Sequence, residues 1–229
     1  MPDLRHALSV VATAEVAGVV RGGSLAAHAR RFAAHVTPWA LMALVAGFTA
    51  ARAFLGPLRW SDLAVVAAFV AFEPVIEWLI HSWILHARPW QVLGRTFELS
   101  ATKGHRRHHQ DPTDLSLVFL PGFVLVVVAP VLTVGLFLLV RPAHLAATAL
   151  AVGAAALLAY EWTHYLIHTT YKPRHRYFRH LWRHHHHYRN EGYWYGVTTA
   201  MGDVLLGTCP RGGAVPVSPT ARTLGKPLS

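Results

Sequence analysis

The sequence predicts an all-α integral membrane protein with four transmembrane helices and a histidine-rich helical cap on one side of the bilayer. Three observations support this fold class: 53% of the 229 residues are hydrophobic, the mean hydropathy is +0.33, and histidines gather where apolar segments end. Such a hydropathy is high for a soluble globular chain. A membrane protein is therefore the first class to consider.

Four apolar stretches approach the length of about 20 residues that a bilayer requires. They are 38–55, 63–85, 117–140 and 143–160. The third gives the clearest prediction because it contains no charged residue. The second contains Glu73, Glu77 and His81, and ionisable groups at membrane depth usually face the interior of a bundle. A soluble protein with buried core helices is the alternative, but charge-free runs of this length are rare in water-soluble folds.

The basic residues follow a membrane topology. Four of them precede Pro38, five lie in the segment 86–116 and nine follow Thr170, and with four spans these three parts share one side of the membrane. The connections on the other side hold only Arg59 and Arg141. The positive-inside rule places the basic side, with the histidine clusters, in the cytoplasm. No nucleic-acid-binding motif accompanies the net charge of +10, so we expect no nucleic-acid partner.

The chain divides into three predicted regions. Residues 1–36 have an Ala/Val/Arg mixture typical of an amphipathic N-terminal arm, broken at Gly22 and Gly23 and without a signal-peptide pattern. Residues 37–209 form the membrane-embedded domain, and 210–229, rich in Pro, Gly, Ser and Thr, form a loose tail. The single cysteine, Cys209, excludes an internal disulfide and a thiolate metal cluster.

Histidine is unusually frequent, with 17 residues, and 12 of these lie in four short clusters. The clusters are HSWILH (His81, His86), HRRHH (His105, His108, His109), HYLIH (His164, His168) and HLWRHHHH (His180, His184, His185, His186, His187). On a helix, positions i, i+3 and i+4 share a face, so the three histidines of HRRHH are predicted to converge while its arginines point away. The two in HSWILH are five apart, which predicts that they lie where a span ends or bends, or that they reach different metal ions.

Four histidine clusters at one face of a membrane protein predict metal binding. A lone histidine is more often an interior residue, and a His/Arg run at a membrane surface can instead bind anionic lipid. Neutral imidazoles suit Fe, Zn, Cu or Ni. Eight or more histidine ligands exceed the number that one metal ion can bind, which indicates two metal ions close together. Glu77 and Glu161 each precede a cluster; they are predicted either to accept an imidazole N–H and orient a ligand, or to form buried pairs with Arg or Lys.

The clusters resemble the histidine boxes of the fatty acid hydroxylase superfamily, which includes sterol desaturases and carotenoid hydroxylases. The segments GHRRHHQDPTDLSLVFLPG, YEWTHYLIHTT and GYWYGVTTAMGDVLLGT are most similar to those of fatty acid 2-hydroxylases, and the resemblance covers residues 73–208. It implies an O2-dependent enzyme with a cytoplasmic dinuclear iron site that hydroxylates a C–H bond in a lipid acyl chain. The similarity to the fatty acid 2-hydroxylases implies C2 as the carbon that is hydroxylated. Zinc can replace the two iron ions in a purified sample.

The resemblance also implies ten metal ligands, which are equally the expected catalytic residues. These are His81, His86, His105, His108, His109, His164, His168, His180, His184 and His187. The family's last box has histidines at i, i+3 and i+4, and residues 180–187 contain no such triplet. His180, His184 and His187 form one helical stripe; the set His180, His184 and His185, and the pair His186 and His187, are the alternatives.

The expected partners are a lipid substrate and a separate electron donor. The 36-residue arm is shorter than the cytochrome b5 domain fused to some family members, and no NAD- or flavin-binding glycine fingerprint is visible. We therefore expect a cytochrome b5-like or ferredoxin-like donor. A sterol or carotenoid hydroxylase or desaturase would use the same boxes. A zinc-binding or metal-transport membrane protein is the alternative of another class, but transport predicts polar residues through several spans, whereas 117–140 has no ionisable residue.

Overall fold

The computed structural model describes residues 24–186, 188–210, 215–219 and 221, which are mostly helical. Its elements are α2 (Leu25–Phe32), α3 (Val36–Phe54), α4 (Trp60–Leu79), η1 (Ile80–Leu85), β1 (Trp90–Val92), β2 (Arg95–Phe97), α5 (Ser100–Gln110), η2 (Leu115–Leu117), η3 (Val124–Val128), α6 (Ala129–Leu139), α7 (Ala143–Ile167), α8 (Arg176–His184) and α9 (Met201–Leu205). The predicted arm before residue 24, its break at Gly22 and Gly23, and most of the predicted tail lie outside the described residues.

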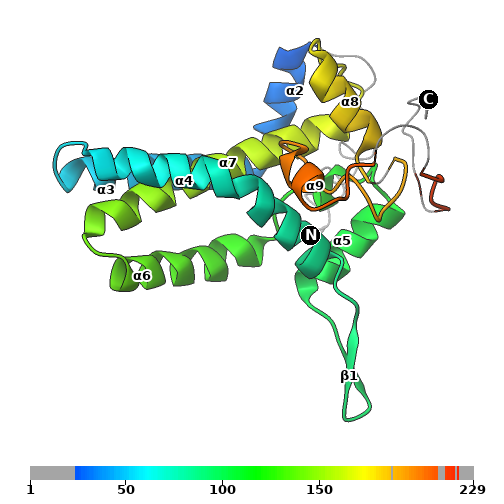
Figure 1. Ribbon diagram of the computed structural model, residues 1–229, viewed down its shortest axis with the longest axis horizontal. Helices are drawn as coiled ribbons and strands as arrows, with labels where there is room; N and C mark the ends of the chain where they lie inside the picture. Colours follow the sequence, from blue (N-terminus) through cyan, green and yellow to red (C-terminus); the bar gives the residue numbers. More distant parts are fainter. Residues whose placement is uncertain (1–23, 187, 211–214, 220, 222–229) are drawn as a thin grey trace, which may run out of the picture.

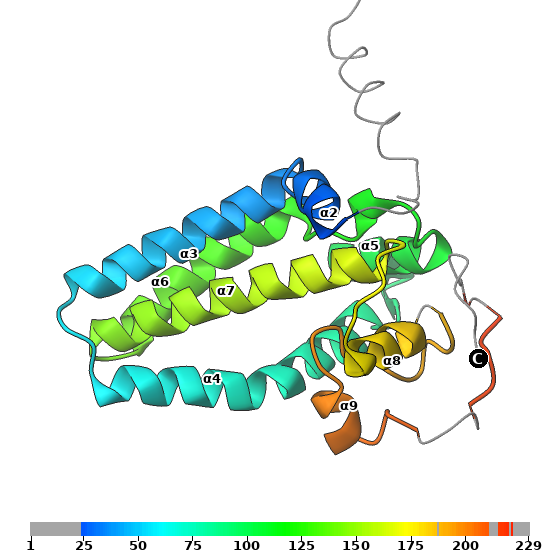
Figure 2. The same cartoon turned by 90° about the horizontal axis from the view of Figure 1, so that it is seen from above.

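Four helices form an elongated bundle, in which α7 packs against α3, α4 and α6 (Figures 1 and 2). Three helical segments are long and apolar enough to cross a membrane: α3 with 19 residues, α4 continued by η1 with 26, and α7 with 25. Most of their residues are not buried inside the protein. Large exposed apolar surfaces are unusual for a soluble monomer and fit helices that face lipid.

The predicted third span, 117–140, is shorter than expected. Its first residues belong to the cap, where Val118 and Phe119 are buried in the hydrophobic core, and the apolar helix covers only Val124–Leu139. Sixteen residues at 1.5 Å each give about 24 Å, less than the roughly 30 Å of a bilayer core. Pro121 precedes this helix and separates the two parts of the apolar run. The described chain thus has three helices of spanning length and a shorter fourth, not four full spans.

A β-hairpin interrupts the all-α pattern between η1 and α5. Strands β1 and β2 pair antiparallel, and Figure 1 shows them projecting away from the bundle. Leu93 and Gly94 form the two-residue turn with positive φ values of 49° and 73°. Two positive φ values are what the tight hairpin turn requires, and the glycine supplies the second without strain. The histidine-free segment between the first two clusters therefore contains a short hairpin.

A helical cap closes one end of the bundle and contains the hydrophobic core. The elements η1, α5, α8, α9 and the end of α7 gather there (Figure 1). Tyr165 and Ile167 at the end of α7 pack with Leu181 and Trp182 of α8 in one buried cluster. The cap therefore contains the main buried apolar cluster of the described residues, and it also carries the histidine clusters.

Helix α9 packs against α4 at Gly202. A Cβ atom at this position would lie 2.3 Å from the carbonyl oxygen of Pro74 and 3.0 Å from Cβ of Trp78. The α4 backbone cannot move away from such a Cβ atom without a cost in free energy. We therefore expect Gly202→Ala to separate the two helices and to lower the free energy of unfolding by about 1–3 kcal/mol. Thermal unfolding in detergent measures the loss. Gly135→Ala in α6 is the control, since a Cβ there would meet nothing within 4 Å; equal stability of both variants would contradict the close approach.

Candidate metal centre

The first histidine pair lies on a π-helical turn. Helix α4 widens into η1, whose last hydrogen bond runs from the His86 N–H to the His81 carbonyl oxygen at 3.2 Å. In a π-helix the bond joins residues five apart, so two side chains with this spacing come to one side. The imidazoles of His81 and His86 lie with ring centroids 5.6 Å apart. The expectation that the pair lies where a span ends is met, and both residues reach one group rather than two.

Helix α5 supplies histidines to two different groups. His105 and His109, one turn apart, face the η1 pair, whereas His108 faces His164 and His168 at the end of α7. Position i+3 lies about 60° to one side of position i, and position i+4 about 40° to the other side. The three imidazoles of HRRHH therefore diverge onto two neighbouring groups, which corrects the prediction that they meet at one point.

The first group brings five Nε2 atoms together. The residues are His81, His86, His105, His109 and His186, and each Nε2 atom lies 3.1–3.2 Å from at least two others. A ring nitrogen carries one hydrogen or one lone pair, so it makes a single directional hydrogen bond. His105 Nε2 faces three other imidazoles at this distance. Mutual hydrogen bonds cannot account for that arrangement.

The second group contains His108, His164 and His168, with the buried imidazole of His185 beside it. His168 Nε2 lies 3.1 Å from His108 Nε2 and 3.2 Å from His164 Nε2. The Nδ1 atoms of His164 and His168 donate to the carbonyl oxygens of Val118 and Pro112, at 3.2 and 3.0 Å. Because a carbonyl only accepts, both Nδ1 atoms carry the proton and both Nε2 atoms present lone pairs to each other.

Both groups fit a metal ion. Lone pairs facing one another at 3.2 Å repel unless a cation lies between them, and the carbonyl partners fix the ring orientation that binding requires. Two nitrogens bound to one ion at about 2.0–2.1 Å are separated by about 2.9 Å in an octahedral and about 3.4 Å in a tetrahedral arrangement. The observed 3.1–3.2 Å falls within this range. The groups adjoin each other, since the ring centroids of His185 and His186 are 4.3 Å apart.

Burial keeps the cap imidazoles neutral. It holds the pKa values of His105, His108, His185 and His186 well below 6.5, and repulsion between neighbouring imidazoles adds to the effect. Burial likewise lowers the pKa of His109 to about 3. A neutral imidazole is the form that binds a metal ion, so no proton has to be displaced from these rings at pH 7.

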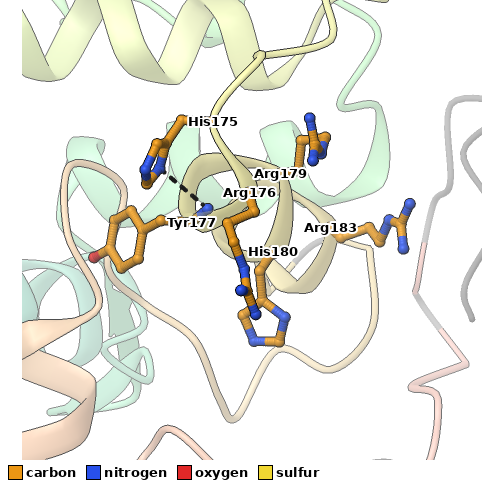
Figure 3. Close-up of a pocket in the computed structure, with 6 residues that line it drawn as sticks. All are labelled: His175, Arg176, Tyr177, Arg179, His180 and Arg183. Carbon is orange, nitrogen blue, oxygen red and sulfur yellow. Dashed lines mark hydrogen bonds between the residues drawn. The ribbon is translucent and has the colours of Figure 1, made fainter.

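The histidines that the last cluster contributes differ from the predicted helical stripe of His180, His184 and His187. Helix α8 ends at His184, and His185 adopts an extended conformation with φ −47° and ψ 132°, so a helical stripe cannot continue to residue 187. His180 is exposed and projects beside Arg176 on the outside of α8 (Figure 3). His184 is half-buried against His180 and Trp194. The structure brings His185 and His186 to the two groups and does not bring His180 or His184 there; His187 lies outside the described side chains.

Glu77 and Glu161 bind backbone rather than imidazoles. Glu77 accepts hydrogen bonds from the N–H groups of Val197 and Thr198 and contacts the Thr198 hydroxyl, while Glu161 accepts the Leu120 N–H at 2.8 Å. Among the described residues, neither forms an ion pair with Arg or Lys. Both differ from the two roles predicted for them: they fix the loops that follow the second and last clusters. The sequence offers no signal for the carbonyl oxygens that orient His164 and His168.

The first group opens to the surface through a small cavity of about 190 Å³. His86, His105 and His109 line it together with Arg88 and Arg106. At its rim, a carboxylate oxygen of Glu191 lies 3.7 Å from Nδ1 of His109. This opening connects the imidazoles of the first group with the polar outside of the cap.

Comparison with known proteins agrees with this geometry. A family model described as fatty acid hydroxylase matches residues 65–208, which contain all four histidine clusters. The dihydroceramide fatty acyl 2-hydroxylase FAH2 of Arabidopsis thaliana is 30% identical over 159 residues. That alignment covers 67% of this chain and 64% of the plant protein, so the chain spans a little under two thirds of the relative's length.

A solved structure shares the fold. It is the structure described as full-length scs7p with only the hydroxylase domain visible, and it superposes with a TM-score of 0.65 at 23% identity. The superposition covers 80% of this chain and 68% of the other. With more than half of its residues matched by the family model and its histidine clusters inside the match, this chain belongs to the fatty acid hydroxylase family.

Proposed function

We propose that this protein hydroxylates a C–H bond at C2 of a lipid acyl chain, using O2 and two electrons from a separate donor protein. The observation that carries the proposal is the pair of adjoining imidazole groups at the end of apolar helices, with Nε2 atoms converging at 3.1–3.2 Å. The choice of C2 is supported by the similarity to a plant fatty acyl 2-hydroxylase. The reaction is R–H + O2 + 2 e⁻ + 2 H⁺ → R–OH + H2O.

The proposed ligands follow the geometry of the two groups. One ion would be held by members of the set His81, His86, His105, His109 and His186, and the other by His108, His164, His168 and His185. Two iron ions at these positions would supply the redox chemistry that activates O2. The all-nitrogen donor set suits iron but also admits zinc. His180 and His184 are left out of this proposed set, because His180 is exposed beside Arg176 (Figure 3) and the His184 imidazole packs against His180 and Trp194.

The chain itself would position the substrate and keep water away. The exposed apolar helices let a lipid approach from the bilayer, and the groups lie where η1 and α7 leave the apolar zone. Seven of the nine proposed ligands are buried, which limits the access of bulk water. The carbonyl oxygens of Val118 and Pro112 keep the rings of His164 and His168 in one orientation.

Product analysis tests the proposal. Lipids from cells expressing the protein under ¹⁸O2 should contain acyl chains with one added ¹⁸O atom, and fragmentation should place it on C2. Matched cells that carry an empty vector set the background. Oxygen found on a sterol or carotenoid ring would assign the other substrate class. Purified protein that holds zinc, and gives no oxygenated product after reconstitution with iron and a reductant, would contradict hydroxylation.

A further inference from the structure

A continuous stretch of the cap is strongly cationic. Residues 162–190 contain six Lys or Arg residues and no Asp or Glu, so this stretch supplies a large part of the net charge of +10. Helix α8 lies in its middle and carries Arg176, Arg179 and Arg183. A concentration of charges of one sign on a short segment creates a local electrostatic potential that attracts an oppositely charged partner.

Helix α8 turns its apolar side inward and its charges outward. Leu181 and Trp182 are buried in the cap core, while Arg176, Arg179 and Arg183 are exposed. The exposed side chains surround a surface hollow of about 580 Å³ that also involves His175, Tyr177 and His180 (Figure 3). Leu181 and Trp182 are used for internal packing, and the exposed residues of α8 are its three arginines together with Tyr177, Phe178 and His180.

The cations spread over the face of α8 instead of converging. In Figure 3, Arg176 projects with His180 to one side, whereas Arg179 and Arg183 point in other directions. Convergent guanidinium groups would indicate a site for one small anion. Separate guanidinium groups on one face match an extended surface with several negative charges, such as that of an acidic protein.

Arg179 and Arg183 lie on the side of α8 that faces away from α9. Tyr177 lies on the side of α8 that meets α9, because its hydroxyl group accepts the Ala200 N–H at 2.8 Å and lies 3.1 Å from the Thr199 hydroxyl group. Helix α9 in turn packs on α4, one of the membrane-length helices. Figure 3 shows Arg179 and Arg183 on the side opposite Tyr177. This orientation favours a soluble protein over lipid headgroups as the occupant.

The same helix leads directly to the imidazole groups. Helix α8 ends at His184, and the next two residues are the buried His185 and His186. His186 Nε2 lies 3.1 Å from Nε2 of both His81 and His109. The outer face of α8 is therefore connected to the candidate metal centre by the short stretch of chain from Arg183 to His186.

We propose that the outer face of α8 is the docking surface for an acidic electron-carrier protein that reduces the metal centre. This inference rests on the proposed function, because hydroxylation consumes two electrons for each O2. Two molecules of a one-electron carrier are oxidised per turnover; one oxygen atom enters the product and the other leaves as water with two protons. The α8 arginines hold the carrier by charge complementarity, and the connection through His185 and His186 brings its redox group near the centre.

Carrier binding tests the docking surface independently of turnover. The full-length protein, purified in detergent with its metal, is titrated with reduced plant-type ferredoxin and, separately, with cytochrome b5, at low and high salt. We expect binding of at least one carrier that weakens as salt screens the charges. The variant Arg176→Glu/Arg183→Glu should weaken that binding by about tenfold or more. Arg179 is retained because it donates to the carbonyl oxygens of Pro173 and Arg174 and so supports the start of α8.

A charge-matched control separates a local surface from a general effect of net charge. Arg95→Glu/Lys103→Glu changes the charge by the same amount at exposed positions on β2 and α5, and it should leave carrier affinity within about twofold. Unaltered metal content and unfolding temperature show that each variant is folded. Equal weakening in both variants, no weakening in either, or no carrier binding by the wild type would overturn the proposal.

Two further experiments test whether the α8 surface binds a protein or lipid headgroups, and separate the docking proposal from the proposed hydroxylase function. In nanodiscs of neutral lipid the α8 variant should keep its binding defect; a defect seen only with anionic lipid would assign the surface to headgroups and overturn the proposal. Product formation is then measured with dithionite as the reductant. The α8 variant should match the wild type with dithionite and fall behind it only with the carrier. A wild type that binds the carrier but forms no product with either reductant would remove the proposed function and leave the docking surface standing.

Discussion

His168→Ala is expected to reduce hydroxylated lipid to background and to remove metal from the second imidazole group. The imidazole of His168 is buried, its Nε2 lies within 3.2 Å of both His108 and His164, and its Nδ1 donates to Pro112. Removing it leaves three of the four imidazoles proposed for this group, and the alanine methyl group supplies no ligand. Metal content per chain should fall by about half, since the first group is intact.

The measurement combines metal analysis of purified protein with mass spectrometry of lipids from the same cells. His180→Ala is the matched control: it removes an imidazole that the sequence predicted as a ligand but that the structure places outside both groups. That variant should keep its metal and its product. Full activity of His168→Ala would refute the proposed centre, and loss of metal in His180→Ala would restore the ligand set favoured by the sequence.

Glu77→Ala is expected to destabilise the cap by about 3 kcal/mol or more. The Glu77 carboxylate lies in α4, one turn before His81, and bonds the backbone of Val197 and Thr198 across the cap. Its removal leaves the buried Val197 N–H without an acceptor, at a cost of about 1–3 kcal/mol, removes the acceptor of the part-buried Thr198 N–H, and creates a cavity. The loop would no longer hold Tyr195 near His81, so we expect weaker metal retention as well.

Thermal unfolding and metal content measure the effect, and Glu77→Gln is the matched variant. The glutamine carbonyl oxygen can accept the same two N–H groups, and its amide can donate to the Thr198 hydroxyl group, so most of the stability should return. A Glu77→Ala protein as stable as the wild type would show that the contacts to the loop contribute little. Equal loss in both variants would instead indicate that the negative charge itself is required.

Local spacing predicted much of the metal centre. His164 and His168 are one turn apart, and the structure places both in the second group. His105, His108 and His109 lie on α5 as expected and all reach the centre, but they divide between two groups. The spacing fixes their angles around the helix axis, whereas the positions of η1 and α7 decide which ring meets which partner. Periodicity alone therefore indicated candidate ligands without assigning them to groups.

The remaining differences arise where a helix changes or ends. The π-helical turn of η1 brings together residues five apart, which regular α-helical spacing keeps separate. At the other end of the centre, α8 stops at His184, so His186 enters the first group and His185 lies beside the second, in place of His180 and His184. The run of four histidines gives no indication of where the helix ends, because every position in it has the same side chain.

By itself, the sequence determined the apolar runs of membrane-spanning length, the helical architecture, the gathering of histidines at one end and the resemblance to the fatty acid hydroxylase superfamily. These features follow from apolar run length and from residue spacing, which act locally along the chain. Only the tertiary structure decided that three helices have spanning length, that Glu77 and Glu161 hold loops, and which histidines form each group. Those outcomes depend on contacts between segments far apart in the chain, such as His81 with His186, and local patterns carry no information about which distant partner a side chain will meet.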